Sequence, residues 1–245
     1  AVSQAALRFH FSEPGDGGLA AAERALSIDA NLAEAHAAIA RVLTSNSKYD
    51  EAQREIETAL RLDPESFEVN TAAARLNYAQ GRYEDATRYY EKAASLMESD
   101  FSSVAMLIAC YRSLGNQAGL RHAAQRTLAR AEKIAAQEPD NGMAMGYVVM
   151  SLIALGQGDR ARELAKRAML LDPDNLTMRY NFACGFVELK DTETALNLLG
   201  AVLEKDTLET VNWAKVDPDL DALRDHPRFK AMIEGAEKRL AMAVG

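Results

Sequence analysis

The sequence predicts an all-α protein: an α-α superhelix, or solenoid, of about six helix–turn–helix repeats followed by C-terminal capping helices. Three observations support this fold class. Similar residues return at steps of 34 along the 245-residue chain, each step contains a turn residue such as Gly81, and alanines recur at fixed distances after that turn. The composition, rich in Ala, Leu, Glu and Arg with only 14 Gly and 6 Pro, also favours helix.

The predicted turns form two series with this step: Ser47, Gly81 and Gly115, then Gly156 and Lys190. Glycine supplies the positive φ that ends the first helix of a repeat. Prolines mark the other boundary, where the second helix gives way to the next repeat. Pro64 and Pro173 both follow Leu-Asp, and Pro139 lies one such step before Pro173. Proline stops a helix because it lacks an N–H donor and its ring clashes with the preceding turn.

Small residues recur in the predicted second helices. The alanines five positions after the turn, and seven positions after those, are Ala52, Ala86, Ala161 and Ala195, then Ala59, Ala93 and Ala168. Two helices that cross closely need small side chains at the contact, and large residues fill the adjacent gaps. We expect Ile56, Tyr90 and Leu199 to fill them.

This pattern resembles the tetratricopeptide repeat, a helix–turn–helix unit with the same step. The best copies span residues 33–64, 67–98 and 142–173. The second-helix signature is well kept, whereas the family's usual Trp is missing from every copy and the first-helix signature survives mainly in Ile39-Ala40 and Phe182-Ala183. The resemblance implies a non-catalytic scaffold that binds a peptide or protein segment in a concave groove lined by the first helices.

The repeats are expected near residues 1–30, 33–64, 67–98, 101–139, 142–173 and 175–207, with a helical cap at 208–245. The first is weak, with a helix at 2–11. The fourth is unusual, because its proline comes at Pro139, seven positions after Glu132, where the step places the boundary. Such a delay corresponds to about two turns of helix. We therefore predict an overlong second helix at 117–137.

The tail after the last repeat predicts helices near 208–215, 219–225 and 228–243, the last with Phe229, Ile233, Ala236, Leu240 and Ala241 on one face. Its sequence is similar to the Asp-Pro-Asp-Leu…Leu-Arg…Pro-Arg-Phe ending that follows such repeats in bacterial multidomain proteins. This second resemblance implies a bacterial origin and an alternative function, a regulatory or sensory C-terminal module of a nucleotide cyclase or transcriptional regulator. The simpler interpretation is a capping element.

Few sequence features point to chemistry. The net charge of −8 disfavours a nucleic-acid partner, and no apolar run is long enough for membrane insertion. The four histidines are scattered, Cys110 and Cys184 are interpreted as buried thiols, and Asp217, Asp219 and Asp221 favour a helix start over a metal site. We expect no enzyme activity, no metal and no cofactor. The expected location is cytoplasmic, with a periplasmic one left open because the chain begins without Met.

The candidate peptide-binding groove is lined by residues that point inward from the first helices: Arg41, Arg75, Tyr78, Arg112, Met150, Ile153 and Tyr180. Its N-terminal half is cationic, and paired guanidinium donors can grip carboxylates. Its C-terminal half is apolar. Two alternatives stay open: the arginines pair with neighbours such as Glu34 or Glu68, and Met150 and Ile153 belong to the core. Homodimerisation through helix 117–137 is a further open expectation.

Overall fold

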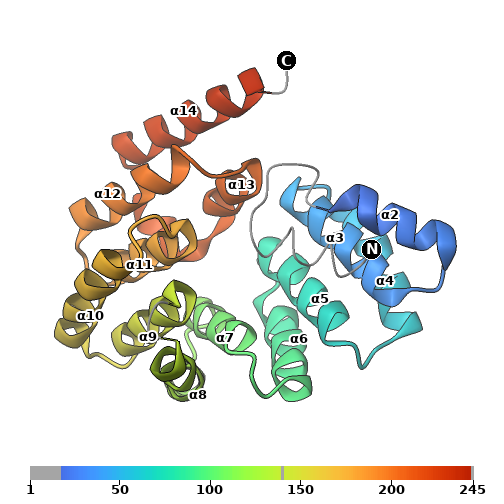
Figure 1. Ribbon diagram of the computed structural model, residues 1–245, viewed down its shortest axis with the longest axis horizontal. Coiled ribbons are helices and arrows are strands. Elements are labelled where there is room, and N and C mark those ends of the chain that lie inside the picture. The colour runs from blue at the N-terminus through green and yellow to red at the C-terminus, as the bar shows by residue number, and fades with distance from the viewer. Residues whose placement is uncertain (1–17, 139–140, 244–245) are drawn as a thin grey trace. The chain divides into compact units, whose positions relative to one another are not determined.

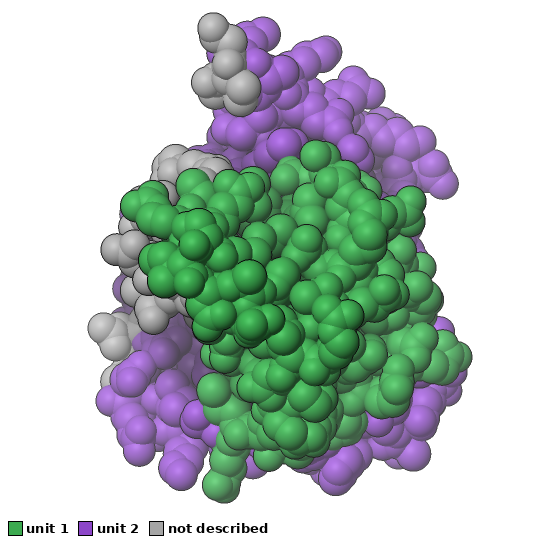
Figure 2. Space-filling view, turned by 90° about the vertical axis from the view of Figure 1, so that its right-hand side faces the viewer, with its two compact units in different colours: residues 1–98 green, residues 99–245 purple. Residues whose placement is uncertain are grey.

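The computed structural model describes residues 18–138 and 141–243, and every regular element within those ranges is a helix (Figure 1). The helix predicted at residues 2–11 lies outside the described ranges. The chain divides into two compact units, residues 1–98 and 99–245, which are coloured separately in Figure 2. The helical-repeat fold class is thereby confirmed, and each unit is described below by itself.

Over residues 18–98, unit 1 contains the second helix of one repeat and two complete helix pairs. Its helices are α2 (Leu19–Ile28), α3 (Ala33–Ser45), α4 (Tyr49–Leu62), α5 (Phe67–Ala79) and α6 (Tyr83–Leu96). Each first helix packs on its own second helix, α3 on α4 and α5 on α6, and the first helices α3 and α5 also pack on each other. This is the stacking that the repeat step predicts.

Unit 2 contains three helix pairs and then three elements outside the repeat. The pairs are α7 (Ser102–Ser113) with α8 (Gln117–Gln137), α9 (Gly142–Ala154) with α10 (Gly158–Leu171), and α11 (Leu176–Glu188) with α12 (Thr192–Leu203). They are followed by α13 (Leu208–Val216), the 3₁₀ helix η1 (Pro218–Leu223) and α14 (Pro227–Ala243). The helix η1 packs against α11 and α7, whereas α14 packs against α12 and α13.

All five predicted turn residues adopt a positive φ. The values are 59° at Ser47, 72° at Gly81, 67° at Gly115, 77° at Gly156 and 59° at Lys190. In each turn the next N–H donates back to a carbonyl five positions earlier, as Arg82 does to Asn77 at 2.9 Å and Asp191 does to Phe186 at 2.9 Å. This bond satisfies a carbonyl that the helix end leaves open. Because the geometry is the same throughout, Ser47 and Lys190 hold a conformation that suits glycine better.

The alanine positions form the contacts between helices, as predicted. Every alanine in the two series is buried, and so are the gap-filling Ile56, Tyr90 and Leu199. Several fully buried alanines and leucines belong to the hydrophobic core of their unit. The small side chains let the helix backbones approach, and the large ones fill the space left between them.

The predicted overlong helix is confirmed. The helix α8 spans 21 residues, whereas the second helices α4, α6 and α10 each span 14 residues. The excess corresponds to about two turns, as the late Pro139 predicts. Leu120, Ala124 and Thr127 are buried along its first half, and Ala131 is the last buried residue. Next to it, Arg130 Nη1 donates to the Asp100 carbonyl at 2.5 Å.

The three tail elements occur close to their predicted positions, with two differences. The middle one is a 3₁₀ helix that begins at Pro218, and Ala241 is exposed, although it was expected on the buried face of the last helix. Phe229 and Ala236 do lie in the core of unit 2, where they join buried residues of α13 and η1. The tail therefore completes the hydrophobic core of unit 2.

Candidate functional site

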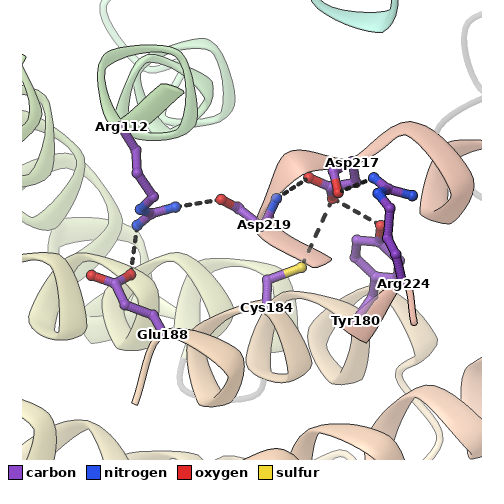
Figure 3. A network of polar contacts seen from close by, with 7 residues as sticks. All are labelled: Arg112, Tyr180, Cys184, Glu188, Asp217, Asp219 and Arg224. Carbon is purple, nitrogen blue, oxygen red and sulfur yellow. Dashed lines mark hydrogen bonds and ion pairs between the residues drawn. The ribbon is translucent and has the colours of Figure 1, made fainter. Parts of the chain in front are cut away.

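A network of polar contacts lies where η1 meets the first helices of unit 2 (Figure 3). We call the side of α7 and α11 that contacts η1 the first-helix face of unit 2. Arg112, near the end of α7, reaches two carboxylates with one guanidinium: Nη2 donates to Glu188 at 2.5 Å and Nη1 donates to Asp219 of η1. The Asp219 side chain is only 8% exposed, so this ion pair is much less accessible than ordinary surface pairs.

Asp217 is the second anchor of the network. Its carboxylate is buried and accepts a hydrogen bond from the Tyr180 hydroxyl at 2.8 Å, from the Asp219 N–H at 3.1 Å and from the Cys184 thiol at 3.9 Å. Tyr180 and Cys184 stand one turn apart on α11 and therefore point to the same side of that helix. A buried carboxylate needs such donors, because an unsatisfied one is costly.

Local sequence explains why the segment presents its aspartates in this way. Asp217 caps η1 through the Asp219 N–H, and Pro218 occupies the first helical position, where no N–H is needed. Arg224 holds the other end of the segment, donating to the Asp217 carbonyl at 2.8 Å, to the Asp221 carboxylate at 2.7 Å and to the Lys215 carbonyl. The aspartates at 217 and 219 are thus left facing α11 and α7.

The electrostatics of the site follow from its burial. Burial raises the pKa of the Tyr180 hydroxyl and of the Cys184 thiol well above their ordinary values, and the nearby Asp217 adds to both shifts. Both groups are therefore neutral donors at physiological pH. Burial also raises the pKa of Glu188; Asp219 adds to this shift and Arg112 opposes it.

The structure distributes the four candidate groove residues of unit 2 unevenly. Arg112 and Tyr180 come together on the same segment of the tail, through Asp219 and Asp217. Ile153 is buried in the core, where an added Cβ at Gly185 would come within 2.5 Å of its Cδ1 atom. Because of this burial, Ile153 has little surface to offer an external peptide. Met150 is half-buried on α9.

In unit 1, Arg41 and Arg75 lie half-buried on the first helices α3 and α5, which pack side by side. Tyr78 is only 1% exposed, and its ring meets that of Tyr83 edge-on at 5.6 Å between centroids. Tyr78 thus packs inside the α5–α6 pair. The two arginines keep partial access to the surface that Tyr78 lacks.

Sequence reasoning did not assign Glu188, Cys184 or the two tail aspartates to one site. The sequence predicts a helix start at Asp217, Asp219 and Asp221, and the capping contact of Asp217 confirms it. The available signal was the alternation of these aspartates with Pro218 and Leu220. When an acidic residue lies on each side of a proline that starts a helix, the first carboxylate can cap the helix. The second carboxylate can then contact another part of the chain, as Asp219 contacts Arg112.

Other candidates for chemistry are limited. Cys110 and Cys184 are both buried thiols, as expected. Within residues 18–138 and 141–243, no three His, Cys, Asp or Glu side chains gather closely enough to hold a metal ion. Over the same residues, no helix combines the length and the apolar character that crossing a membrane requires.

Comparison with known proteins identifies the repeat. Residues 37–100 match the family model for the tetratricopeptide repeat. Similar solved structures include YrrB, described as a tetratricopeptide repeat protein with an unusual peptide-binding site (19% identity, 89% of this chain and 98% of that chain, TM-score 0.46). PilF of Pseudomonas aeruginosa is similar at 10% identity (86% and 91%, TM-score 0.49), and MamA at 17% (68% and 94%, TM-score 0.43). No curated protein sequence matches. The match to the tetratricopeptide repeat thus covers residues 37–100.

Proposed function

We propose that this chain of tetratricopeptide repeats is a non-catalytic scaffold that binds a peptide or protein segment through its first helices. One observation carries the proposal: the first-helix face of unit 2 already holds a short segment, η1 of the same chain, by side chains that project from two different first helices. A surface that binds a short segment within the chain has the chemistry to bind one from a partner.

The contacts to η1 are those that peptide recognition uses. Leu220 and Leu223 are fully buried in the core of unit 2, and the polar contacts of Arg112 and Tyr180 fix the orientation of the segment. Buried apolar anchors supply most of the affinity of such interfaces, while a few charged hydrogen bonds supply direction and specificity.

Unit 1 offers a second surface of the same kind. Arg41 and Arg75 stand one repeat step apart, at equivalent positions of the adjacent helices α3 and α5. Guanidinium groups bind carboxylates through paired N–H donors. The partner proposed for this surface is therefore an acidic segment of a protein.

A peptide library rich in Asp, Glu and Leu, immobilised with free and with amidated C-termini, tests the proposal. The full chain should bind a subset of the peptides, and Arg75→Glu should abolish binding of those that occupy unit 1 without changing the melting temperature. Arg54→Glu, at an exposed position of the second helix α4, is the matched control. The proposal would be refuted if the chain bound the acidic library no better than an uncharged library. It would also be refuted if neither Arg75→Glu nor Arg112→Gln changed the binding.

Two finer statements belong to the same proposal. A cytoplasmic location fits the buried thiols of Cys110 and Cys184, since reducing compartments keep thiols reduced. Homodimerisation through α8 would use exposed residues such as His122 and Lys133, and light scattering coupled to gel filtration tests it.

The alternative, a regulatory module of a signalling protein, gains no support from the tail, because burial of Leu220, Leu223 and Phe229 already accounts for that sequence.

A further inference from the structure

We infer that the first-helix face of unit 2 recognises an acidic segment, with two aspartates two positions apart followed by leucine, and that residues 217–220 occupy this face as the chain's own ligand. An external segment of the same chemistry binds there only by displacing them. This inference rests on the proposed function, because it takes the first-helix faces to be peptide-binding surfaces and names the partner for one of them.

The face is built for two carboxylates. Arg112 comes from α7 and Tyr180 from α11, and these residues meet aspartates 107 and 37 positions further along the chain. The guanidinium donates to Asp219 and the hydroxyl donates to Asp217. Leu220, which follows directly, is fully buried in the core of unit 2. Charge, hydrogen bonding and shape therefore select the pattern Asp-x-Asp-Leu.

The segment is held by its surroundings more than by its own backbone. The helix η1 has six residues, and 3₁₀ helices have poor hydrogen-bond geometry and are seldom longer than one turn. A segment of this kind takes its conformation from the surface it contacts, as a bound peptide does.

The segment can leave the face without the rest of the tail. On its N-terminal side, Lys215 of α13 forms an ion pair with Glu237 of α14 at 2.8 Å. On its C-terminal side, Arg228 of α14 contacts Glu193 of α12 at 3.3 Å and Asn197 at 2.6 Å. These contacts do not involve η1 and hold α13 to α14 and α14 to α12. Within the tail, opening of residues 217–226 breaks the exposed contacts of Arg224 with the Lys215 carbonyl and of Lys230 with Asp225. Because the opening exposes Leu220 and Leu223, it is a sub-global opening, whose free energy lies above that of a mobile loop and below that of global unfolding.

The tether sets the strength of the competition. A segment linked to its site by a short connection has an effective concentration of roughly millimolar, so a free peptide with the same contacts competes poorly with it. Loss of the Asp219 carboxylate weakens the internal contact and leaves Arg112 and Tyr180 available. The apparent affinity for an external peptide then rises in proportion to the fraction of open molecules.

Fluorescence polarisation of a labelled peptide with the sequence of residues 214–226 tests the inference on the full chain. Asp219→Asn should bind this peptide about tenfold more tightly than the wild-type chain, or better, because the ion pair that closes the face is lost. Asp221→Asn is the matched control, since Asp221 is exposed and contacts Arg224. Adding Arg112→Gln to Asp219→Asn should remove the gain, and a peptide with asparagine at positions 217 and 219 should not bind.

Equal affinity of the wild-type chain and Asp219→Asn, or affinity that does not depend on Arg112, would overturn the inference. If Asp219→Asn unfolds at the assay temperature, the wild-type chain is titrated instead with up to millimolar concentrations of the two peptides. Binding of the native 214–226 peptide without binding of its asparagine variant supports the inference. Any other outcome refutes it. If a library peptide bound in an Arg75-dependent way while the 214–226 peptide did not bind, this inference alone would be refuted. The proposed function would still hold.

Discussion

The two units are built from the same helix pair, and unit 2 adds a tail whose helix η1 contacts its first helices α7 and α11. In unit 1, the first helices α3 and α5 carry Arg41 and Arg75 in half-buried positions. In unit 2, Arg112 of the first helix α7 is engaged by Asp219 and Glu188. In both units the repeat pattern determines how the helices stack, and in unit 2 residues outside the repeat determine what Arg112 contacts.

The largest expected effect separates the two units. Leu220→Ala removes a fully buried side chain and should lower the unfolding free energy of unit 2 by about 2–5 kcal/mol. Hydrogen exchange should then show weaker protection in residues 99–243 and unchanged protection in residues 18–98. Leu208→Ala, at the exposed start of α13, should have little effect. Equal loss of protection in both units would break the comparison.

A smaller effect is expected from the hydroxyl that holds Asp217. Tyr180→Phe deletes a hydrogen bond to a buried carboxylate and should cost about 1.5–3 kcal/mol in urea denaturation. Tyr89→Phe, in unit 1, is the control, because the half-buried Tyr89 meets Arg88 through its ring. If Tyr180→Phe is as mild as the control, Asp217 does not depend on this donor.

The turns allow the same backbone position to be compared in the two units. Lys190→Gly in unit 2 relieves a positive φ in a residue with a side chain and should stabilise the protein by about 0.5–1 kcal/mol. Gly81→Ala in unit 1 should destabilise it by about 1 kcal/mol, and no atom lies within 4 Å of the added Cβ. Melting temperatures measure both, and two shifts of the same sign would contradict the account.

The smallest effect concerns Glu188, whose pKa is raised by burial. For a carboxyl group with a raised folded-state pKa, the favourable contribution to stability is complete below the unfolded-state pKa and is lost as the pH rises through the folded-state pKa. Glu188→Gln should therefore gain stability relative to the wild-type chain between about pH 4 and about pH 7. The gain should stay below about 1 kcal/mol, because the side chain is partly solvated. Urea denaturation of both proteins at about pH 4 and about pH 7 measures the gain. A loss of stability in Glu188→Gln relative to the wild-type chain would contradict the raised pKa of Glu188.

The sequence was sufficient for features that depend on nearby residues. Turn positions, alanine contacts and the length of α8 all follow from a pattern that is complete within a single repeat. The position of Tyr78 and Ile153 was harder to predict, because a first helix between two neighbours is apolar on most sides. Periodicity then does not distinguish a core residue from one that faces the groove.

The contacts of the tail lie beyond what local pattern can specify. Arg112 and Asp219 are 107 residues apart, and no spacing rule connects them. The sequence showed an acidic cluster at Asp217 and a cationic residue at Arg112 as separate features. Their pairing depends on how three repeats stack before the tail returns, which is a consequence of tertiary structure.

Thiol alkylation tests the central claim, that η1 is a detachable ligand of unit 2, most directly. Cys184 lies under Asp217, whereas Cys110 is buried within α7. In the folded wild-type chain, Cys184 should be alkylated about tenfold faster than Cys110, because local opening of residues 217–226 exposes it, and Asp219→Asn should increase the difference. Equal rates for both thiols, set by global unfolding of the unit, would contradict the claim.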